Sequence, residues 1–216
     1  IWKDYDFVLY FRNSLGVTLV AVLISLVAST LTGYGATRFN FRGKNTFLSF
    51  ILMTQMFPSI MLLVPFYKIL SVYGLNNSLV GLCIVYVSFT IPFCSWMMVG
   101  YFRTIPTEID ESAAIDGASH LQTFWKIALP LVKPGLVSSA IYAFITCWNE
   151  YMFAAILLVN DKLKTAAVAI AEMNGYYKIA WNDMMAASLV ASVPLIIAFV
   201  FMQKSFISGL TAGAVK

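Results

Sequence analysis

Four neighbouring residues near the end of a long apolar stretch combine polar groups with aromatic rings: Trp148, Asn149, Glu150 and Tyr151. A carboxylate and an amide can hydrogen-bond hydroxyl groups, and flat rings can stack on the apolar faces of a sugar. An acid inside an apolar segment is costly unless it faces a pore, a water-filled cavity or a partner. The group therefore fits either the lining of a solute pathway or a polar clamp between helices, and the sequence leaves both open.

Other chemically interesting side chains are isolated. Gln55 lies in a different apolar stretch and is a weaker candidate for the same pathway. His120 has no nucleophile or acid arranged around it, so we expect a surface or docking role. The three cysteines lie in apolar stretches without a CxxC pair, which predicts free thiols rather than a disulfide or zinc site. We therefore expect no catalytic residue and no bound metal.

The composition predicts a membrane protein. Of the 216 residues, 60% are hydrophobic and only 11% are charged, whereas soluble domains carry about 25% charged residues. A bilayer core requires about 20 mostly apolar helical residues. Five segments satisfy this: 14–36, 46–67, 78–102, 134–159 and 184–203. The sequence thus predicts an all-α, polytopic membrane protein in which residues 1–216 form a single domain.

Basic residues indicate the orientation of these spans. Arg38, Arg42 and Lys44 crowd the short loop between the first two spans, and basic residues in short loops favour the cytoplasm. This places the C-terminus in the cytoplasm and the N-terminus outside. An outside start without a signal peptide implies an earlier span, so we expect six spans in the intact subunit.

The loop 103–133 is amphipathic and predicts two short helices. Pro106 suits a first helical turn, and three acids follow it near the positive end of the helix. Gly117 is placed to end this helix, and Ser119 with Gln122 predicts a capping box that opens the next one. Pro130 is expected to close the unit. Two such helices form either a projecting docking site for another protein or an interfacial helix on the bilayer.

A resemblance to a known family favours the docking site. The run ESAAIDG at 111–117, followed after nine residues by IALP at 127–130, resembles the EAA loop of ABC importer permeases. Only Ser112 departs from that pattern, and it keeps a small side chain. The resemblance implies a type I ABC importer permease fold, with this loop docked on a partner ATPase. The coupling residues that it implies are Glu111, Ala113, Gly117, Ile127, Leu129 and Pro130.

Energy must then come from that partner. The chain lacks the G-x-x-x-x-G-K-[ST] phosphate loop, because the segment around Gly43 and Lys44 has neither the upstream glycine nor the hydroxyl residue. We therefore expect a non-enzymatic subunit without a cofactor of its own, with ATP and magnesium on the partner ATPase.

The resemblance extends over most of the chain and is closest to maltose-type carbohydrate permeases. The Trp-Asn-Glu-Tyr run at 148–151 and the tail at 206–216 carry this narrower match. It implies import of a carbohydrate, most simply an oligosaccharide, across a bacterial inner membrane. The implied partners are a second homologous permease, an ATPase dimer and an extracytoplasmic solute-binding protein, with no nucleic acid.

Two alternatives stay open at this stage. The cargo could be another small solute, such as a polyol or glycerol phosphate. A secondary transporter driven by ions would need a relay of ionisable groups within the spans. Glu150 stands alone in that respect, and such a transporter would have no use for the loop 103–133.

Overall fold

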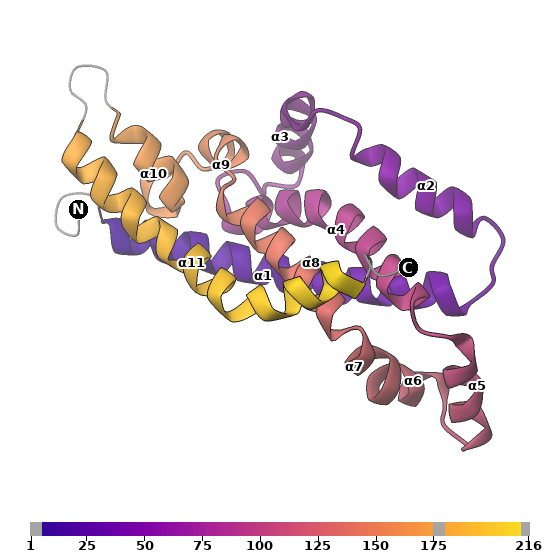
Figure 1. Ribbon diagram of the computed structural model, residues 1–216. Helices are drawn as coiled ribbons and strands as arrows, with labels where there is room; N and C mark the ends of the chain where they lie inside the picture. Colours follow the sequence, from indigo (N-terminus) through magenta and orange to yellow (C-terminus); the bar gives the residue numbers. More distant parts are fainter. Residues whose placement is uncertain (1–5, 175–179, 213–216) are drawn as a thin grey trace.

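The computed structural model describes residues 6–174 and 180–212, with side chains described up to residue 200. The tail match at 206–216 therefore lies outside the described side chains, and its last four residues lie outside the described chain. Within the described residues the structure is helical and contains no strand, which confirms the all-α prediction. The elements, shown in Figure 1, are α1 (Phe7–Arg38), α2 (Lys44–Thr54), η1 (Ser59–Leu62), α3 (Leu63–Val72), α4 (Leu79–Arg103), α5 (Thr107–Ile115), α6 (His120–Thr123), η2 (Phe124–Ala128), α7 (Leu129–Leu131), α8 (Lys133–Trp148), α9 (Met152–Leu157), η3 (Asp161–Leu163), α10 (Ala166–Glu172) and α11 (Trp181–Ala212).

Three helices in the described part of the chain are long and apolar enough to cross a membrane without a break: α1, α4 and the first twenty residues of α11. These correspond to the first, third and fifth predicted spans. Two further spans are obtained if bent helix pairs each count as one. The prediction of five spans is therefore met only when these bent pairs are included.

The second predicted span, 46–67, is not one helix. α2 ends at Thr54, and the chain resumes as η1 and α3 after a bend of 94°. Pro58 precedes η1 with φ −57° and ψ 125°, an extended conformation that cannot continue a helix. The observed break is nearly a right angle, so the apolar segment forms two helices rather than one.

The fourth predicted span, 134–159, is also wrong as a continuous helix. α8 ends at Trp148 and α9 starts at Met152, so the predicted span is interrupted at the Trp-Asn-Glu-Tyr run. The second bent pair instead joins residues 120–131 to α8, at 74°. Apolar residues flank the interruption on both sides, so the segment passed as one span by average composition.

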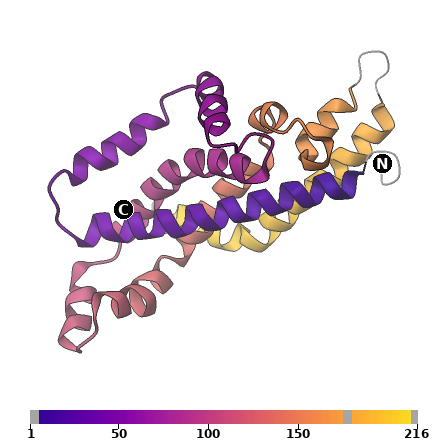
Figure 2. The ribbon, with the colours of Figure 1, turned by 180° about the vertical axis from the view of Figure 1, so that it is seen from behind.

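α1 and α4 form the central pair of the bundle, lying side by side in both ribbon views (Figure 1 and Figure 2). Small residues recur every fourth position on the buried face of α1: Ala21, Ser25, Ser29 and Gly33. Such spacing lets two membrane helices approach closely. The Ser25 and Thr90 hydroxyls share a hydrogen bond at 2.6 Å, and a Cβ on Gly33 would lie 2.8 Å from the Cβ of Met98.

The N-terminal end of α1 is fixed to the chain segment before α10. Asn13 donates to the carbonyls of Lys162 and Lys164 at 2.9 and 3.0 Å, and Ser14 accepts from the amide of Ala166 at 2.8 Å. One hydrophobic cluster joins buried residues of α1 and α4 with buried residues of α9 and α10. These bonds explain why α1 begins at Phe7, seven residues before the predicted span.

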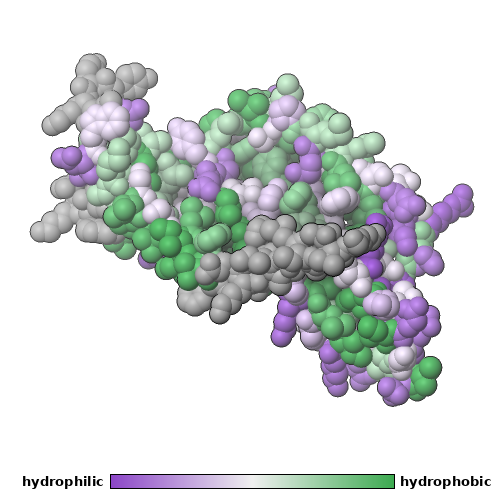
Figure 3. Space-filling view, viewed as in Figure 1, coloured by the Kyte–Doolittle hydropathy of each residue, from purple (hydrophilic) through white to green (hydrophobic). Residues whose placement is uncertain are grey.

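Apolar side chains dominate the visible face of the bundle, and hydrophilic residues gather at its two ends (Figure 3). With 32 residues, α1 is about 48 Å long, which exceeds the roughly 30 Å of a hydrocarbon core. Its last turn therefore lies beyond the apolar zone, at the end where α5, α6 and α7 project from the bundle.

Candidate functional site

The loop 103–133 folds as the predicted pair of helices with a sharp bend between them. α5 begins after Pro106, which adopts an extended conformation one residue before the helix. Gly117 has φ +83°, in the left-handed region that glycine enters without steric cost. The predicted capping box is confirmed: the Ser119 amide donates to Gln122 Oε1 at 2.8 Å, and the Gln122 amide donates to Ser119 Oγ at 3.3 Å.

The second helix of the loop ends at Leu131, one residue after Pro130, and the chain bends at Val132 before α8 begins. Residues 124–128, just before the proline, form a wider π-helical turn. Pro130 has no N–H, and its ring would clash with the carbonyl four residues earlier in a regular helix, so the wider turn accommodates it.

An ion pair ties this loop to the end of α1. Arg38 Nε lies 2.7 Å from Asp110 Oδ2, with 7% of the Arg38 side chain and 19% of the Asp110 side chain exposed. The same guanidinium donates to the carbonyl of Ile105 at 3.1 Å. Because both charges are largely withdrawn from water, each depends on the other for neutralisation.

Aromatic side chains pack together where the loop meets the ends of α1 and α4. The Tyr34 ring contacts Phe124 and Phe102 edge-on, with centroid separations of 4.9 and 5.6 Å, and its hydroxyl donates to the carbonyl of His120 at 3.4 Å. Phe39 packs against the His120 ring at 5.5 Å. The loop and the ends of α1 and α4 thus share one hydrophobic cluster.

The outer face of the loop exposes apolar and acidic groups. Ile115, Leu121 and Trp125 are 87%, 66% and 59% exposed, and hydrophobic residues are visible on the projecting unit in Figure 3. Glu111 is also exposed and has no ion-pair partner among the described residues. Such a face suits contact with another protein.

The six predicted coupling residues divide by burial. Glu111, Gly117 and Pro130 are exposed, Ile127 and Leu129 are half-buried, and Ala113 is buried. Ala113 therefore holds α5 against the rest of the loop, whereas Glu111 is available to a partner.

A second candidate region lies where α8 gives way to α9. The buried Trp148 stacks on Phe144 at 5.6 Å and meets Phe11 edge-on at 5.5 Å. Its indole N–H donates to the carbonyl of Ala191 in α11 at 3.0 Å. Trp148 therefore joins α1, α8 and α11.

Glu150 is bonded within its own chain. Its two carboxylate oxygens accept from the amides of Phe153 and Ala154 at 2.8 and 3.1 Å. These are amides of the first turn of α9, where a negative charge is favoured by the helix dipole. The acid therefore starts the helix that follows it, and the half-buried carboxylate has the donors that it needs.

The four residues of the Trp-Asn-Glu-Tyr run do not share one site. Trp148 and Asn149 line a pocket of about 240 Å³ together with residues of α10 and α11, including Ser188 and Ser192. Glu150 and Tyr151 do not line it. Asn149 donates only to the carbonyl of Ile145 in its own helix, so its carbonyl oxygen is free among the described contacts.

Gln55 lies apart from this pocket, at the end of α2. Its amide donates to the carbonyl of Phe89 in α4 at 3.2 Å. Phe89 packs against Phe153 at 5.2 Å, and the backbone amide of Phe153 donates to Glu150. Gln55 and Glu150 are thus linked only through aromatic packing.

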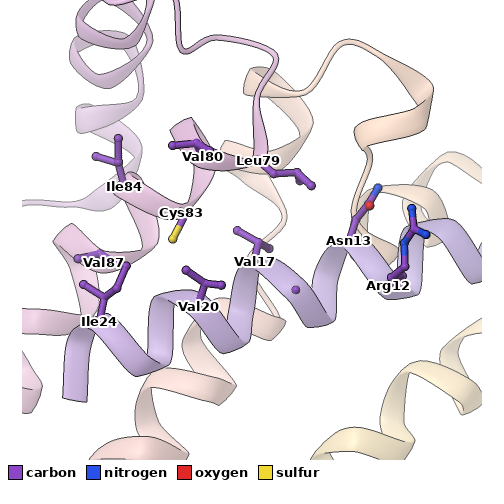
Figure 4. Close-up of a pocket in the computed structure, with 11 residues that line it drawn as sticks. Arg12, Asn13, Val17, Val20, Ile24, Leu79, Val80, Cys83, Ile84 and Val87 are labelled. Carbon is purple, nitrogen blue, oxygen red and sulfur yellow. The ribbon is translucent and has the colours of Figure 1, made fainter. Parts of the chain in front are cut away.

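A larger pocket lies on the outer side of α1 and α4 (Figure 4). It measures about 720 Å³, and its lining is apolar apart from Arg12 and Asn13. The Asn13 amide is already engaged with the loop before α10. A sugar site needs several convergent polar groups, so the smaller pocket beside Trp148 is the better candidate.

Metal binding finds no support in the described residues, where no group of three His, Cys, Asp or Glu side chains is placed to hold an ion. Cys83, Cys94 and Cys147 are free and buried.

Sequence reasoning missed the residues that anchor the loop, namely Tyr34, Arg38 and Asp110. Arg38 was used only as a marker of orientation. The available signal was its position in the last turn of a span that meets a loop rich in acids.

Comparisons with known proteins agree on one family. A family profile described as binding-protein-dependent transport system inner membrane component matches residues 21–211. The chain is 37% identical over 208 residues to the trehalose/maltose transport system permease protein MalG of Thermococcus litoralis, covering 96% of this chain and 75% of that protein. It is equally identical, with the same coverage, to the maltodextrin transport system permease protein MdxG of Bacillus subtilis.

The fold is also similar to a solved structure. A chain in the crystal structure of a bacterial ABC transporter involved in the import of the acidic polysaccharide alginate superposes with a TM-score of 0.81 at 25% identity, covering 95% of this chain and 77% of that one.

Proposed function

Because the chain belongs to the binding-protein-dependent transport system inner membrane components, the permeases of ABC importers, we propose that it forms half of a carbohydrate translocation pathway. One observation carries the proposal: the projecting α5–α7 unit is anchored to α1 through Arg38 and Asp110 and exposes Glu111 on its outer face. An isolated surface helix on a bilayer would need no such ion pair to the transmembrane bundle. The anchored unit is suited to receive force from a partner.

The partner in this proposal is an ATPase dimer, which binds ATP and magnesium and hydrolyses the nucleotide. Glu111 pairs with a basic residue of the ATPase, while Ile115, Leu121 and Trp125 supply apolar contact area. Closure of the ATPase dimer displaces the α5–α7 unit, and the Arg38–Asp110 pair and the Tyr34 cluster pass this movement to α1 and α4. A rigid-body movement of this kind can switch the pathway between inward-facing and outward-facing states.

The orientation follows from the same assignment. The α5–α7 unit and the basic ends of α1, α2 and α4 lie at one end of the bundle. The proposal places this end, and with it the C-terminus, in the cytoplasm of a bacterium with the chain in its inner membrane. A second homologous permease completes the pathway, and an extracytoplasmic binding protein delivers the substrate.

The proposed cargo is an oligosaccharide, because the relatives named above carry trehalose, maltose or maltodextrin in their names. The pocket beside Trp148 and Asn149 offers polar groups that such a solute requires: a free amide oxygen and the Ser188 and Ser192 hydroxyl groups. The Ser188 and Ser192 hydroxyls donate to carbonyls of their own helix at 2.7 Å and keep lone pairs for a ligand. A polyol or glycerol phosphate is the alternative cargo.

The test is ATP hydrolysis by the complex. The full-length subunit is co-expressed with its neighbouring permease, ATPase and binding protein, and ATPase activity is measured in nanodiscs with and without oligosaccharides. Glu111→Arg should lower the sugar-stimulated rate about thirtyfold, since breaking a charge pair at an interface costs at least about 2 kcal/mol.

Glu108→Arg is the matched control, because it reverses another exposed acid of α5. Unlike Glu111, Glu108 lines a pocket with residues of α1 and α2. The control variant should leave the stimulated rate within about twofold, in line with the small effect of an exposed charge outside an interface. Equal effects of the two variants, or an ATPase that never co-purifies, would overturn the proposal.

A further inference from the structure

Two adjoining hollows lie at the end of the bundle that carries α5. A polar pocket of about 470 Å³ is bounded by the end of α1, the start of α2 and the segment after α4, and it includes Lys44 and Arg103. A groove of about 310 Å³ between α2 and α4 also ends at Arg103. Both ribbon views place the ends of α1 and α4 and the start of α2 together (Figure 1 and Figure 2).

The polar pocket has unneutralised positive charge. Arg103 has no ion pair or hydrogen bond in the described part of the chain, and Lys44 donates only to the neutral oxygens of Phe39 and Asn40. Arg38 also lines the pocket, but its charge is balanced by Asp110. Glu108 is the opposing acid among the described lining residues, so the free cations outnumber the free acids.

The groove that leads away from the cations is suited to an apolar chain. Leu48 and Leu52 of α2 and Trp96 and Val99 of α4 line it, and Trp96 is 52% exposed. Asn45 and Ser49 are the polar side chains of α2 in the same lining. Gly100 opens the groove, because a Cβ there would meet no atom within 4 Å. The cluster of Ala36, Leu48 and Val99 closes the floor between the two hollows.

The position matches the membrane boundary. Arg103 directly follows the apolar end of α4, and Lys44 begins α2, whose apolar residues start at Phe47. A molecule bound here would have its charge at the headgroup level and its apolar part among the spans. Phospholipids have this division, and basic pockets between transmembrane helices bind anionic headgroups.

We propose that Lys44 and Arg103 bind the headgroup of an anionic phospholipid, with one acyl chain in the groove between α2 and α4. A protein helix in the same groove would leave both cations unpaired unless it supplied acids at the same depth. The inference rests on the proposed function for one point, that this end of the bundle faces the anionic cytoplasmic leaflet. The site also lies beside Arg38, so the bound lipid contacts the region that anchors the coupling unit.

The experiment is native mass spectrometry of the complex that contains the full-length subunit. Phosphatidylglycerol is titrated against phosphatidylcholine with the same acyl chains. Wild type should retain phosphatidylglycerol in preference. The double variant Lys44→Gln, Arg103→Gln should bind it about thirtyfold more weakly and each single variant about fivefold, because each basic residue near an anionic headgroup contributes roughly a factor of five.

Matched variants separate headgroup from groove. Arg42→Gln removes an exposed charge from the same loop without touching either hollow, and it should change nothing. Glu108→Gln should strengthen binding. Gly100→Leu should weaken binding of both lipids by filling the groove, whereas Gly16→Leu, at another open glycine, should leave the wild-type phosphatidylglycerol affinity unchanged.

Absence of a headgroup preference in wild type, or an Arg42→Gln effect equal to that of Arg103→Gln, would overturn the proposal. Failure of the complex to assemble with Gly100→Leu, together with no headgroup preference, would show that a protein helix fills the groove. Glu111→Arg should not alter lipid binding, so loss of ATPase coupling and loss of the lipid site are distinguishable.

Discussion

The indole N–H of Trp148 donates to the backbone carbonyl of Ala191, three residues before Pro194 in α11. The amide of Gln55 makes the same kind of bond to Phe89, three residues before Pro92 in α4. Proline supplies no N–H to its helix and disturbs the backbone of the preceding turn. In a bilayer, neighbouring side chains can bond the carbonyls of such a distorted turn. Both side chains therefore hold a proline-containing helix in place.

Trp148→Phe should lower stability without changing substrate affinity. Phenylalanine keeps the stacking on Phe144 but removes the bond to Ala191, which is worth roughly 1 kcal/mol in a membrane. The measurements are thermal unfolding of the purified complex and the sugar concentration at half-maximal ATPase stimulation. Asn149→Ala should behave in the opposite way, raising that concentration while leaving the unfolding temperature unchanged. A shift in sugar affinity with Trp148→Phe would instead assign the ring to the substrate.

Breaking the Arg38–Asp110 pair should uncouple ATP hydrolysis from substrate. Arg38→Met or Asp110→Leu alone leaves one largely buried charge unpaired, at a cost of roughly 3 kcal/mol. We expect basal ATPase activity to persist while sugar stimulation is lost. The double variant removes both charges, and it should recover part of the stimulation and most of the stability.

Lys164→Met is the control for this cycle. It breaks two ion pairs at the opposite end of the bundle, in which Lys164 is 14% exposed but its acids are 79% and 52% exposed. Because water reaches both acids, we expect these pairs to contribute at most about 1 kcal/mol. If Arg38→Met has no larger effect on coupling than Lys164→Met, the anchoring role of Arg38 is wrong.

Two glycines that lie two positions apart in α1, and therefore on nearly opposite sides of the helix, test the packing of α1 on α4. Gly33→Ala would place a Cβ 2.8 Å from Met98 Cβ and 2.9 Å from its backbone carbon, so the helices must separate. We expect a loss of roughly 1–3 kcal/mol, as for other overpacked cores. Gly35→Ala meets no atom within 4 Å and should leave stability equal or slightly higher. Thermal unfolding of the two variants side by side checks this, and equal stabilities would contradict the close approach.

Much of the fold was predictable because its signals are local. Uncharged stretches marked α1, α4 and α11, and Ser119 with Gln122 marked the start of α6 through bonds between residues three apart. The repeat from Ala21 to Gly33 was a readable signal for helix packing that the prediction did not use. What could not be predicted depends on partners distant in sequence. Arg38 and Asp110 are 72 positions apart, and nothing in the composition of either segment specifies that they meet.

Glu150 shows the same limit at a single residue. Its position in an apolar run predicted that the acid faces a pore, a water-filled cavity or a partner. In the structure its carboxylate accepts hydrogen bonds from two backbone amides of α9. Whether the ionisation of Glu150 is needed for transport distinguishes two transport mechanisms. A secondary transporter would need this carboxylate to bind and release a proton or an ion, whereas an ATP-driven permease needs it only as a helix cap.

Glu150→Gln and Glu150→Ala separate these roles. Glutamine keeps one oxygen that can accept an amide, so it should retain most sugar-stimulated ATPase activity and lose less than about 1 kcal/mol of stability. Alanine removes both bonds and should cost roughly 1–2 kcal/mol, as for other lost caps. Uptake into proteoliposomes is measured beside thermal unfolding. Complete loss of uptake in a Glu150→Gln protein that unfolds at the wild-type temperature would mean that ionisation of Glu150 is required for transport, and the ion-driven mechanism would then have to be reconsidered.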